Sequence, residues 1–209
     1  MTTWDERFRE GEYPLDPDPA PVLRQYVDSF PDGRALDIAT GTGRNAVFLA
    51  ENGYTVDALD KSREGLRIAR ENAEKRGVDE HCSWIQGDAF EHAYPEDTYD
   101  VITIQSFRIL DRLTDVKAAL APDGVIYYQT HLRTSKPVDY GPSERHRVGA
   151  NELLRACLDL TVLHYREFTT GSEGHRGAYA QVIARNSHGH TQGTPHEPGP
   201  EFTESDTED

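Results

Sequence analysis

One stretch, Ala35-Leu-Asp-Ile-Ala-Thr-Gly-Thr-Gly-Arg-Asn-Ala46, limits the possible folds of this chain more than any other. It reads as a short apolar strand, a glycine turn and the start of a helix. Gly41 and Gly43 carry no Cβ, so the backbone can turn sharply and approach a ligand closely. The N–H groups at the start of the helix face the same ligand. The stretch therefore predicts a site for a cofactor that contains a nucleoside.

Strands and helices are expected to alternate around this stretch. Strands are expected over residues 34–39, 55–59, 83–86, 99–105 and 125–130, and helices over 21–29, 44–52, 63–76 and 111–120. Ser62 is expected to cap the helix over 63–76, and Gly77 to end it. Such alternation is typical of a parallel sheet with helices on both faces.

The alternation of strands and helices ends after residue 131. A long polar loop over 131–149 precedes a short helix over 152–158, which Asn151 is expected to cap. Two extended segments follow, 161–168 and 178–185, and the polar link between them is too short for a crossover helix. If these two segments pair, they should pair antiparallel.

The two ends of the chain differ from this alternating part. Residues 1–33 hold a polar segment and one short helix, and the prolines between residues 14 and 21 exclude a long helix. Residues 186–209 offer almost nothing to bury and are expected to form a disordered acidic tail. The expected organisation is an N-terminal segment with its helix over 1–33, one domain over 34–185, and the tail.

The charge of the chain bounds its partners and its location. The formal net charge is −15, with 37 acidic and 22 basic residues, and few of the basic residues are lysines. This balance favours adaptation to high salt, with an ordinary acidic cytosolic protein as the alternative. It argues against a nucleic-acid groove, which needs clustered Lys and Arg. With no apolar run long enough for a membrane span and no visible signal peptide, a cytoplasmic protein is expected.

Neither the cysteines nor the histidines predict a metal site. Cys82 and Cys157 are expected to be reduced thiols rather than part of a disulfide framework. His188, His190 and His196 lie in the tail, which offers no scaffold for a metal. We therefore expect no metal ion.

Three acidic residues bear on the choice of cofactor. The glycine turn formally matches the dinucleotide fingerprint G-x-G-x-x-G/A. Asp37, however, lies inside the first strand, where it would repel a pyrophosphate and attract an ammonium group. Asp60 ends the second strand and suits ribose hydroxyls, and Asp88 follows the third and suits an adenine amino group. Three carboxylates around one glycine turn favour a cofactor without phosphates.

At these residues the chain resembles the class I S-adenosylmethionine (SAM) methyltransferases, over roughly residues 34–185. Asp37-Ile-Ala-Thr-Gly-Thr-Gly43 resembles their first motif, with Ala39 where many members have glycine. Residues 43–53 and Trp4-Asp-Glu-Arg-Phe8 resemble the tellurite-resistance and thiopurine-type members, in which the N-terminal segment folds over the site. The resemblance implies a Rossmann-like α/β three-layer sandwich. Its seven-stranded sheet would be mostly parallel, with an antiparallel C-terminal strand pair.

The resemblance also implies site residues and an activity. The residues expected to bind SAM are Asp37, Ala39, Thr40, Gly41, Gly43, Arg44, Asn45, Asp60, Lys61, Asp88, Ala89 and Gln105. The candidates for the substrate side are Trp4, Phe8, Tyr13, Arg108 and His131. The expected reaction is methyl transfer from SAM to a small-molecule acceptor, such as a thiol or a metalloid oxyanion, which would need no general base. No catalytic residue is assigned.

Two other functions are alternatives at this level. A nicotinamide-dependent oxidoreductase would place a pyrophosphate on the glycine turn, but the chain has no Tyr-x-x-x-Lys pair and Asp37 is badly placed for that cofactor. A non-catalytic SAM-binding module would use the same cofactor site without turnover. Comparing the binding of NAD(H) and SAM distinguishes the oxidoreductase from the methyltransferase. A methyl-transfer screen distinguishes the non-catalytic SAM-binding module from the methyltransferase.

Overall fold

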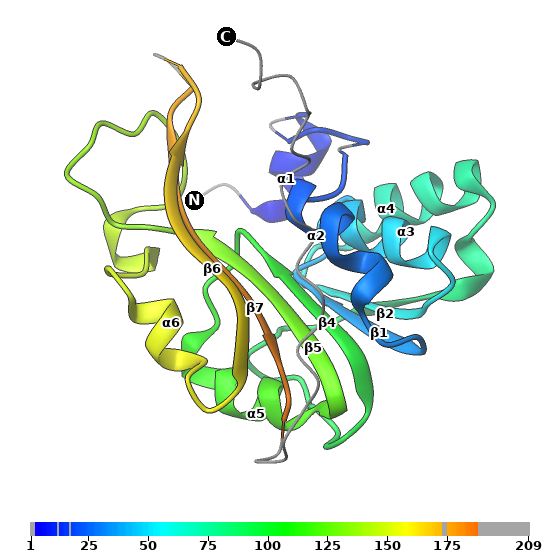
Figure 1. Cartoon of the computed structure of the whole chain (residues 1–209). Helices are drawn as coiled ribbons and strands as arrows, with labels where there is room; N and C mark the ends of the chain where they lie inside the picture. Colours follow the sequence, from blue (N-terminus) through cyan, green and yellow to red (C-terminus); the bar gives the residue numbers. More distant parts are fainter. Residues whose placement is uncertain (1–2, 12, 17, 173–174, 188–209) are drawn as a thin grey trace, which may run out of the picture.

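The structure, a computed structural model, describes residues 3–11, 13–16, 18–172 and 175–187 (Figure 1). Its strands are β1 (Arg34–Ile38), β2 (Thr55–Asp60), β3 (Cys82–Gln86), β4 (Tyr99–Gln105), β5 (Leu120–His131), β6 (Thr161–Thr170) and β7 (Gly177–Arg185). Its α-helices are α1 (Trp4–Arg9), α2 (Pro21–Tyr26), α3 (Arg44–Glu51), α4 (Arg63–Arg76), α5 (Leu113–Ala118) and α6 (Glu152–Ala156). Short 3-10 helices lie at Val27–Ser29, Asp79–His81, Leu110–Arg112 and Glu144–His146.

The strands form one sheet in the order β3-β2-β1-β4-β5-β7-β6. Strands β1 to β5 run parallel, whereas β7 lies antiparallel between β5 and β6. The predicted mostly parallel sheet with an antiparallel C-terminal pair is confirmed. The strand order reverses at β1, which lies between β2 and β4. This point is the topological switch of the sheet, where α/β proteins bind their ligands at the carboxyl ends of the strands.

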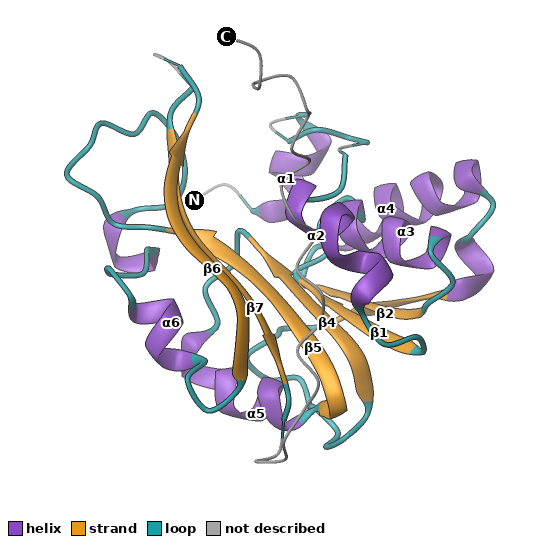
Figure 2. Ribbon diagram, viewed as in Figure 1, coloured by secondary structure: helices purple, strands orange, loops and turns teal. Residues whose placement is uncertain are grey.

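Helices cover both faces of the sheet, as Figure 2 shows: α2, α3 and α4 lie on one side, and α5 and α6 on the other. One buried apolar cluster includes Leu23 of α2 and Tyr127 of β5, and the other includes Leu153 of α6 and Tyr128 of β5. The two neighbouring tyrosines enter opposite layers because side chains alternate along a strand. The expected three-layer sandwich is therefore present.

The residues predicted to begin and end α4 do so, whereas the residue predicted to cap α6 does not. The Ser62 hydroxyl accepts a hydrogen bond from the backbone N–H of Gly65, and Gly77 ends α4 with a left-handed φ of 70°. Asn151 occupies the N-cap position of α6, yet its side chain makes no capping hydrogen bond. The prediction that Asn151 caps this helix is wrong. Its φ of 56° departs from the extended backbone that aims a capping side chain at the helix.

Two segments differ from the predicted elements. The sequence predicts no helix before residue 21, yet α1 forms because Thr3 and Glu6 make a reciprocal capping box at its start. Strand β5 begins at Leu120 rather than at residue 125, so it includes Pro122-Asp-Gly124, which lies between the predicted helix over 111–120 and the predicted strand over 125–130. A register shift between Tyr99 and Val101 of β4 accommodates these extra residues.

Asn186, the first residue of the expected tail, packs against the start of β5. Asn186 is buried, and its side-chain amide donates a 2.9 Å hydrogen bond to the carbonyl of Leu120. The rest of the predicted tail after Ser187, with His188, His190 and His196, lies outside the described residues. Within the described part of the chain, no helix is long and apolar enough to cross a membrane.

Candidate functional site

Strands β1 and β4 both end at the switch point in a left-handed turn. Ala39 follows β1 with a φ of 58°, and Ser106 follows β4 with a φ of 59°. Such conformations cost about 1–3 kcal/mol in a non-glycine residue and gather at functional sites. The left-handed backbone at Ala39 explains why glycine fits this position with less strain.

The glycine turn connects β1 to α3. The N–H of Gly43 donates a 2.9 Å hydrogen bond to the carbonyl of Thr40, and Gly41 and Gly43 have φ values of 56° and 86°. A Cβ on Gly43 would lie 2.8 Å from the Cβ of Ala69 in α4. Gly43 therefore allows both the turn and the close packing of α4 against it.

Asp37 lies beneath the turn and is only 2% exposed. One of its carboxylate oxygens accepts a 2.6 Å hydrogen bond from the Thr40 hydroxyl, and the other accepts one of the same length from the Thr103 hydroxyl on β4. Burial raises the pKa of Asp37 to about 6, against the lowering effect of these hydrogen bonds. A positive group at the turn would meet a carboxylate that is fixed in place and poorly solvated.

Asp60 holds the turn from β2. Its carboxylate accepts 2.8 Å hydrogen bonds from the backbone N–H groups of Gly41 and Ser62. Burial raises the pKa of Asp60, and the backbone hydrogen bonds oppose that rise. Each carboxylate oxygen has a second acceptor position, so Asp60 can still accept a hydrogen bond from a ligand hydroxyl.

Asp88 and Lys61 form an ion pair beyond the ends of β3 and β2. Lys61 Nζ lies 2.7 Å from Asp88 Oδ2, and Asp88 Oδ1 accepts a 3.0 Å hydrogen bond from the N–H of Phe90. The hydrogen bond from Lys61 lowers the pKa of Asp88, which is therefore a carboxylate at neutral pH. Ala89 beside it is buried. The three predicted acids thus lie at the carboxyl ends of three adjacent strands.

Helix α1 packs on the glycine turn from above. A Cβ on Gly41 would lie 3.4 Å from the ring of Phe8, and a Cβ on Gly65 would lie 3.0 Å from it. The Phe8 ring therefore contacts the turn and the first turn of α4 together. Asp5 accepts a hydrogen bond from the Ser62 hydroxyl, which fastens α1 to the start of α4.

Trp4 and Tyr13 surround Phe8 in an aromatic cluster. The ring centroids of the three residues lie 5.5–6.1 Å apart. Phe8 is buried, whereas Trp4 is 50% exposed and Tyr13 is 36% exposed. The N-terminal segment therefore presents an open aromatic surface next to the glycine turn.

Arg44, Asn45 and Gln105 extend the site from the turn toward β4. Asn45 Nδ2 donates a 3.0 Å hydrogen bond to Gln105 Oε1 at the end of β4. Arg44 Nε is buried and has no hydrogen-bond partner among the described residues. A buried donor without a partner is costly, which makes Arg44 a candidate for binding an anionic ligand group.

The two remaining candidates lie apart from the turn. Arg108 binds Asp111 and Glu152 of α6, on the opposite face of the sheet, so the structure does not bring it to the other predicted residues. His131 ends β5, is buried, and has its ring 5.1 Å from that of Tyr179. Burial lowers the pKa of His131 to about 4, so its ring is neutral at pH 7.

The structure adds polar residues that the sequence reasoning did not single out. They are Thr103 on β4, Tyr127 and Gln129 on β5, Arg166 on β6 and Gln181 on β7. Tyr127, Gln129 and His131 occupy alternate positions along β5, and this pattern could have identified Tyr127 and Gln129 from the sequence. Arg166 and Gln181 meet Gln129 only through the antiparallel register of β5, β7 and β6.

Comparisons with known proteins bear on the family. A family model described as "Methyltransferase domain" matches residues 35–124. The ubiquinone biosynthesis O-methyltransferase of Vibrio campbellii is 30% identical over 171 residues, which cover 77% of this chain and 68% of that protein. The residues that the family model matches include the glycine turn and all three acids.

Solved structures share the fold. TehB from Haemophilus influenzae superposes with a TM-score of 0.70 at 20% identity, covering 87% of this chain and 66% of that chain. A SAM-dependent methyltransferase from Aquifex aeolicus superposes with a TM-score of 0.61 at 19% identity, covering 88% and 99%. The Rossmann-like fold expected from the sequence is confirmed.

The site chemistry agrees with these comparisons. Asp37, Asp60 and Asp88 surround the glycine turn, a set of carboxylates that would repel the pyrophosphate of a dinucleotide. The same carboxylates match the ammonium, hydroxyl and amino groups of SAM. The nicotinamide alternative gains no support from either source. The chain belongs to the SAM-dependent methyltransferases, and SAM is its cofactor.

Proposed function

We propose that this enzyme transfers the methyl group of SAM to a small-molecule acceptor that binds over the carboxyl ends of β4 and β5. The observation that carries this proposal is the position of Asp37 and Asp60 on two sides of one glycine turn, at the switch point of the sheet. A cofactor bound on that turn leaves the ends of the next two strands for the acceptor.

Each acid has a proposed task toward the cofactor. Asp37 favours the methionine ammonium through its buried negative charge. Asp60 accepts hydrogen bonds from the ribose hydroxyls, and Asp88 accepts one from the adenine amino group. Lys61 keeps Asp88 ionised through its 2.7 Å ion pair.

The backbone and the remaining predicted residues complete the proposed cofactor site. The turn between β1 and α3 lets the chain approach SAM closely, because it has no bulky side chain at its glycines. Asn45 and Gln105 border its methionine end. The N-terminal segment over residues 1–33 would cover the cofactor, since Phe8 already contacts Gly41. Exclusion of water by this cover would strengthen the charge interactions inside the site.

The reaction mainly requires the chain to position the acceptor against the methyl group of SAM. Bound SAM supplies an electrophilic methyl group, and the acceptor lone pair forms the new bond to carbon while the carbon–sulfur bond breaks with its electron pair on sulfur. The chain must hold the acceptor in line with that bond. A thiolate or a metalloid oxyanion already carries the attacking lone pair and has no proton to lose, so for such acceptors we assign no general base. A hydroxyl acceptor, of the kind that the name of the Vibrio campbellii relative indicates for that protein, would in addition release its proton to solvent.

Isothermal titration with SAM and a methyl-transfer screen test the proposal. We expect SAM to bind, and we expect Asp60→Asn to weaken that binding by roughly tenfold, because a neutral amide holds hydroxyl donors less strongly than a carboxylate. Asp28→Asn, an exposed acid after α2, is the matched control. Absence of binding at millimolar SAM, at low and at high salt, would contradict the cofactor site. Bound SAM without methyl transfer to thiols, phenols, amines or metalloid oxyanions would contradict the small-molecule acceptor.

A further inference from the structure

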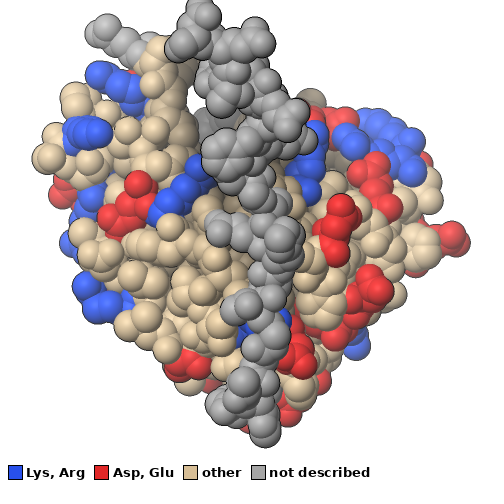
Figure 3. All heavy atoms as spheres, in the orientation of Figure 1, with Lys and Arg blue, Asp and Glu red and all other residues tan. Residues whose placement is uncertain are grey.

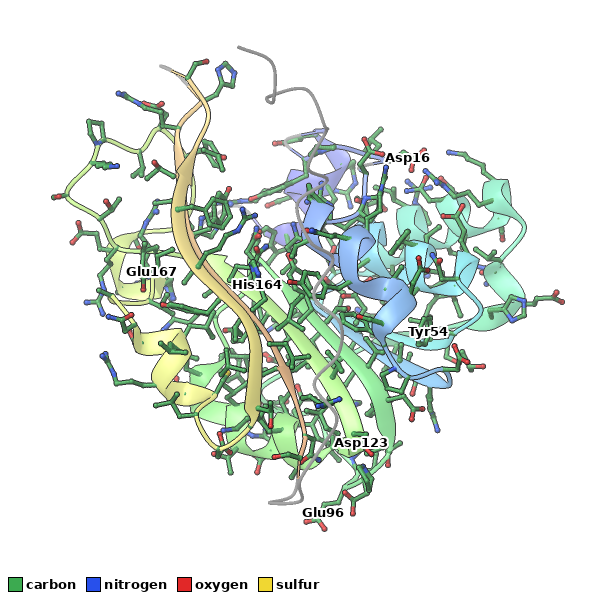
Figure 4. All side chains as sticks on the ribbon, viewed as in Figure 1. Asp16, Tyr54, Glu96, Asp123, His164 and Glu167 are labelled. Atoms are coloured by element: carbon green, nitrogen blue, oxygen red, sulfur yellow. The ribbon has the colours of Figure 1, made fainter. Side chains whose placement is uncertain are left out.

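A row of polar side chains crosses the sheet on the face that carries α2 and α3. Gln129 of β5, Gln181 of β7 and Arg166 of β6 occupy matched register positions on three neighbouring strands. The ring of His164, two residues before Arg166 on β6, lies 5.7 Å from Tyr26 of α2, which identifies the face. In Figure 4, His164 and Glu167 point to opposite sides of β6. Three long polar side chains therefore lie side by side where an apolar layer would bury more surface.

The first chain of hydrogen bonds in this row starts at Arg166. Its Nε donates a 2.8 Å hydrogen bond to Gln181 Oε1. A guanidinium can only donate, so Gln181 must turn its oxygen toward Arg166 and its N–H groups toward β5. There, Gln181 Nε2 donates a 2.6 Å hydrogen bond to Gln129 Oε1. Gln129 is left with its own amide N–H groups, which have no partner among the described residues.

A second, separate chain of hydrogen bonds ends in the same way on β4. The backbone N–H of Ala20 donates a 3.4 Å hydrogen bond to Asn45 Oδ1. A backbone N–H can only donate, so Asn45 presents its amide nitrogen to Gln105 and donates a 3.0 Å hydrogen bond to Gln105 Oε1. The amide N–H groups of Gln105 are then left without a partner in the described part of the chain.

The two chains of hydrogen bonds end next to each other. Gln105 and Gln129 are register partners on the parallel strands β4 and β5, so their side chains share one face at the carboxyl ends of both strands. Every acceptor oxygen in the two chains is already occupied by an internal donor. The polar atoms of Gln105 and Gln129 that have no partner among the described residues are their amide nitrogens.

Two guanidinium groups place positive charge near these amides. The hydroxyl of Tyr127 donates a 3.3 Å hydrogen bond to Gln129 Oε1, and Arg44 and Arg166 both act electrostatically on that hydroxyl. Arg166 is fixed by its hydrogen bond to Gln181 and by the ring of Phe168, whose centroid lies 4.0 Å from the guanidinium carbon. The terminal nitrogens of Arg166 have no partner among the described residues.

Neither Arg44 nor Arg166 has a carboxylate within ion-pair distance among the described residues, although Asp37 and Asp18 act on Arg44 from farther away. Described arginines that pair with Asp or Glu are Arg24, Arg34, Arg67, Arg70, Arg76, Arg108, Arg112, Arg133 and Arg176. In Figure 3, Lys and Arg side chains stand beside β6 with acidic side chains next to them, and both kinds also occur over the side where α3 and α4 lie. In a protein of net charge −15, positive groups without acidic partners form a locally attractive site for an anion.

We propose that the methyl acceptor carries a carboxylate or another oxyanion group, which the amides of Gln105 and Gln129 bind between the guanidinium groups of Arg44 and Arg166. This inference rests on the proposed methyltransferase function and specifies its substrate class. An anionic group with several oxygens matches unused amide N–H groups and guanidinium nitrogens. A neutral acceptor would leave the amide N–H groups of Gln129 and the terminal nitrogens of Arg166 without an anionic partner.

The test uses two probes of the same size. The full-length protein is first titrated with SAM, which examines the proposed function by itself. The protein saturated with S-adenosylhomocysteine is then titrated with 3,4-dihydroxybenzoate and with 3,4-dihydroxybenzamide, which differ in charge at one group. Ionic strength is held constant because salt screens exposed charges. We expect the carboxylate to bind roughly tenfold to a hundredfold more tightly than the amide.

The variant Gln129→Glu replaces hydrogen-bond donors of the site by a negative charge, with almost no change in the shape of the side chain. Glu keeps the oxygen that accepts from Gln181 and replaces the outward N–H groups by a negative oxygen, so the preference for the carboxylate should disappear while SAM affinity stays unchanged. Arg166→Met keeps an apolar stem over Phe168, removes the charge, and serves if the first variant does not fold. Gln25→Glu, exposed on α2, is the matched control and should behave as the wild type.

Two outcomes would overturn the inference while leaving SAM binding intact. One is equal binding, or no binding, of the benzoate and the benzamide to the wild type. The other is an unchanged preference for the carboxylate in both Gln129→Glu and Arg166→Met. Failure of the first titration with SAM would instead contradict the proposed function, so the two failures are distinguishable.

Discussion

The hydroxyl of Thr103 on β4 donates a 2.6 Å hydrogen bond to the carboxylate of Asp37 on β1. The two residues are register partners and both are buried. Their hydrogen bond ties together the two strands that flank the switch point of the sheet. Because Thr40 binds the other oxygen of Asp37, one carboxylate joins β1, β4 and the glycine turn. Asp37 therefore holds the turn in its shape, and we propose that it also acts on the cofactor.

Asp37→Asn should weaken SAM binding by roughly tenfold to a hundredfold, because it removes the negative charge that favours the methionine ammonium. Asparagine has nearly the same size, so the packing around the turn is retained. Titration calorimetry with SAM measures the change, with Asp28→Asn as the control. Unchanged affinity in Asp37→Asn would remove the main support for this role of the carboxylate.

The raised pKa of Asp37 predicts an opposite pH dependence for stability and for binding. Its pKa is about 6 in the folded chain and 3.8 in the absence of the fold. The native state thus holds the proton more tightly, so the contribution of Asp37 to the free energy of unfolding falls as pH rises through this window, by about 3 kcal/mol. Above the window this contribution is constant.

SAM affinity should change in the other direction over the same window. An ammonium group prefers the ionised carboxylate, so affinity should fall as pH drops below about 6. Denaturant unfolding and SAM titration at several pH values measure the two effects, and Asp37→Asn should lack both. Equal pH profiles for the wild type and this variant would show that another group is responsible.

Ala39→Gly should stabilise the protein, although glycine usually destabilises. Ala39 has a φ of 58°, and relief of left-handed strain is worth about 1–2 kcal/mol. The greater freedom of glycine in the unfolded chain removes about 0.4–1 kcal/mol of that gain. The expected net effect is a gain of about 0.5–1 kcal/mol in urea unfolding. Ala118→Gly, at an exposed right-handed position in α5, should instead lower the free energy of unfolding. A lower free energy of unfolding in Ala39→Gly as well would contradict the proposed backbone strain at Ala39.

Phe8→Ala should detach α1 from the glycine turn. The buried Phe8 ring contacts Gly41 and Gly65, and burial of a phenylalanine contributes about 1.5–3 kcal/mol. Trypsin cleavage after Arg7 and Arg9 should become faster, and SAM affinity should fall if the N-terminal segment covers the cofactor. Leu158→Ala, at a 63% exposed position, is the control. Faster cleavage with unchanged SAM affinity would separate the packing of α1 from a role in cofactor binding.

Local signals predicted most of the elements, because they act within a few residues. Alternating apolar runs identified β1 to β5, and the Ser62 cap and Gly77 bounded α4 at the observed residues. The same kind of signal was overlooked at α1, where Thr3 and Glu6 form a capping box. It misled at Asn151, whose residue type suits a cap but whose left-handed backbone does not.

The sequence by itself determined the strand, the glycine turn and the three acids, since a turn with positive φ and carboxylates at strand ends depend on local residue types. Only the tertiary structure decided which distant side chains meet. The parallel register placed Gln105 beside Gln129, and the antiparallel register placed Gln181 and Arg166 next to them. Arg108, a candidate by position, was carried instead to Glu152 on the opposite face. Register and layer follow from burial of whole strand faces, a property of the assembled sheet that no single segment contains.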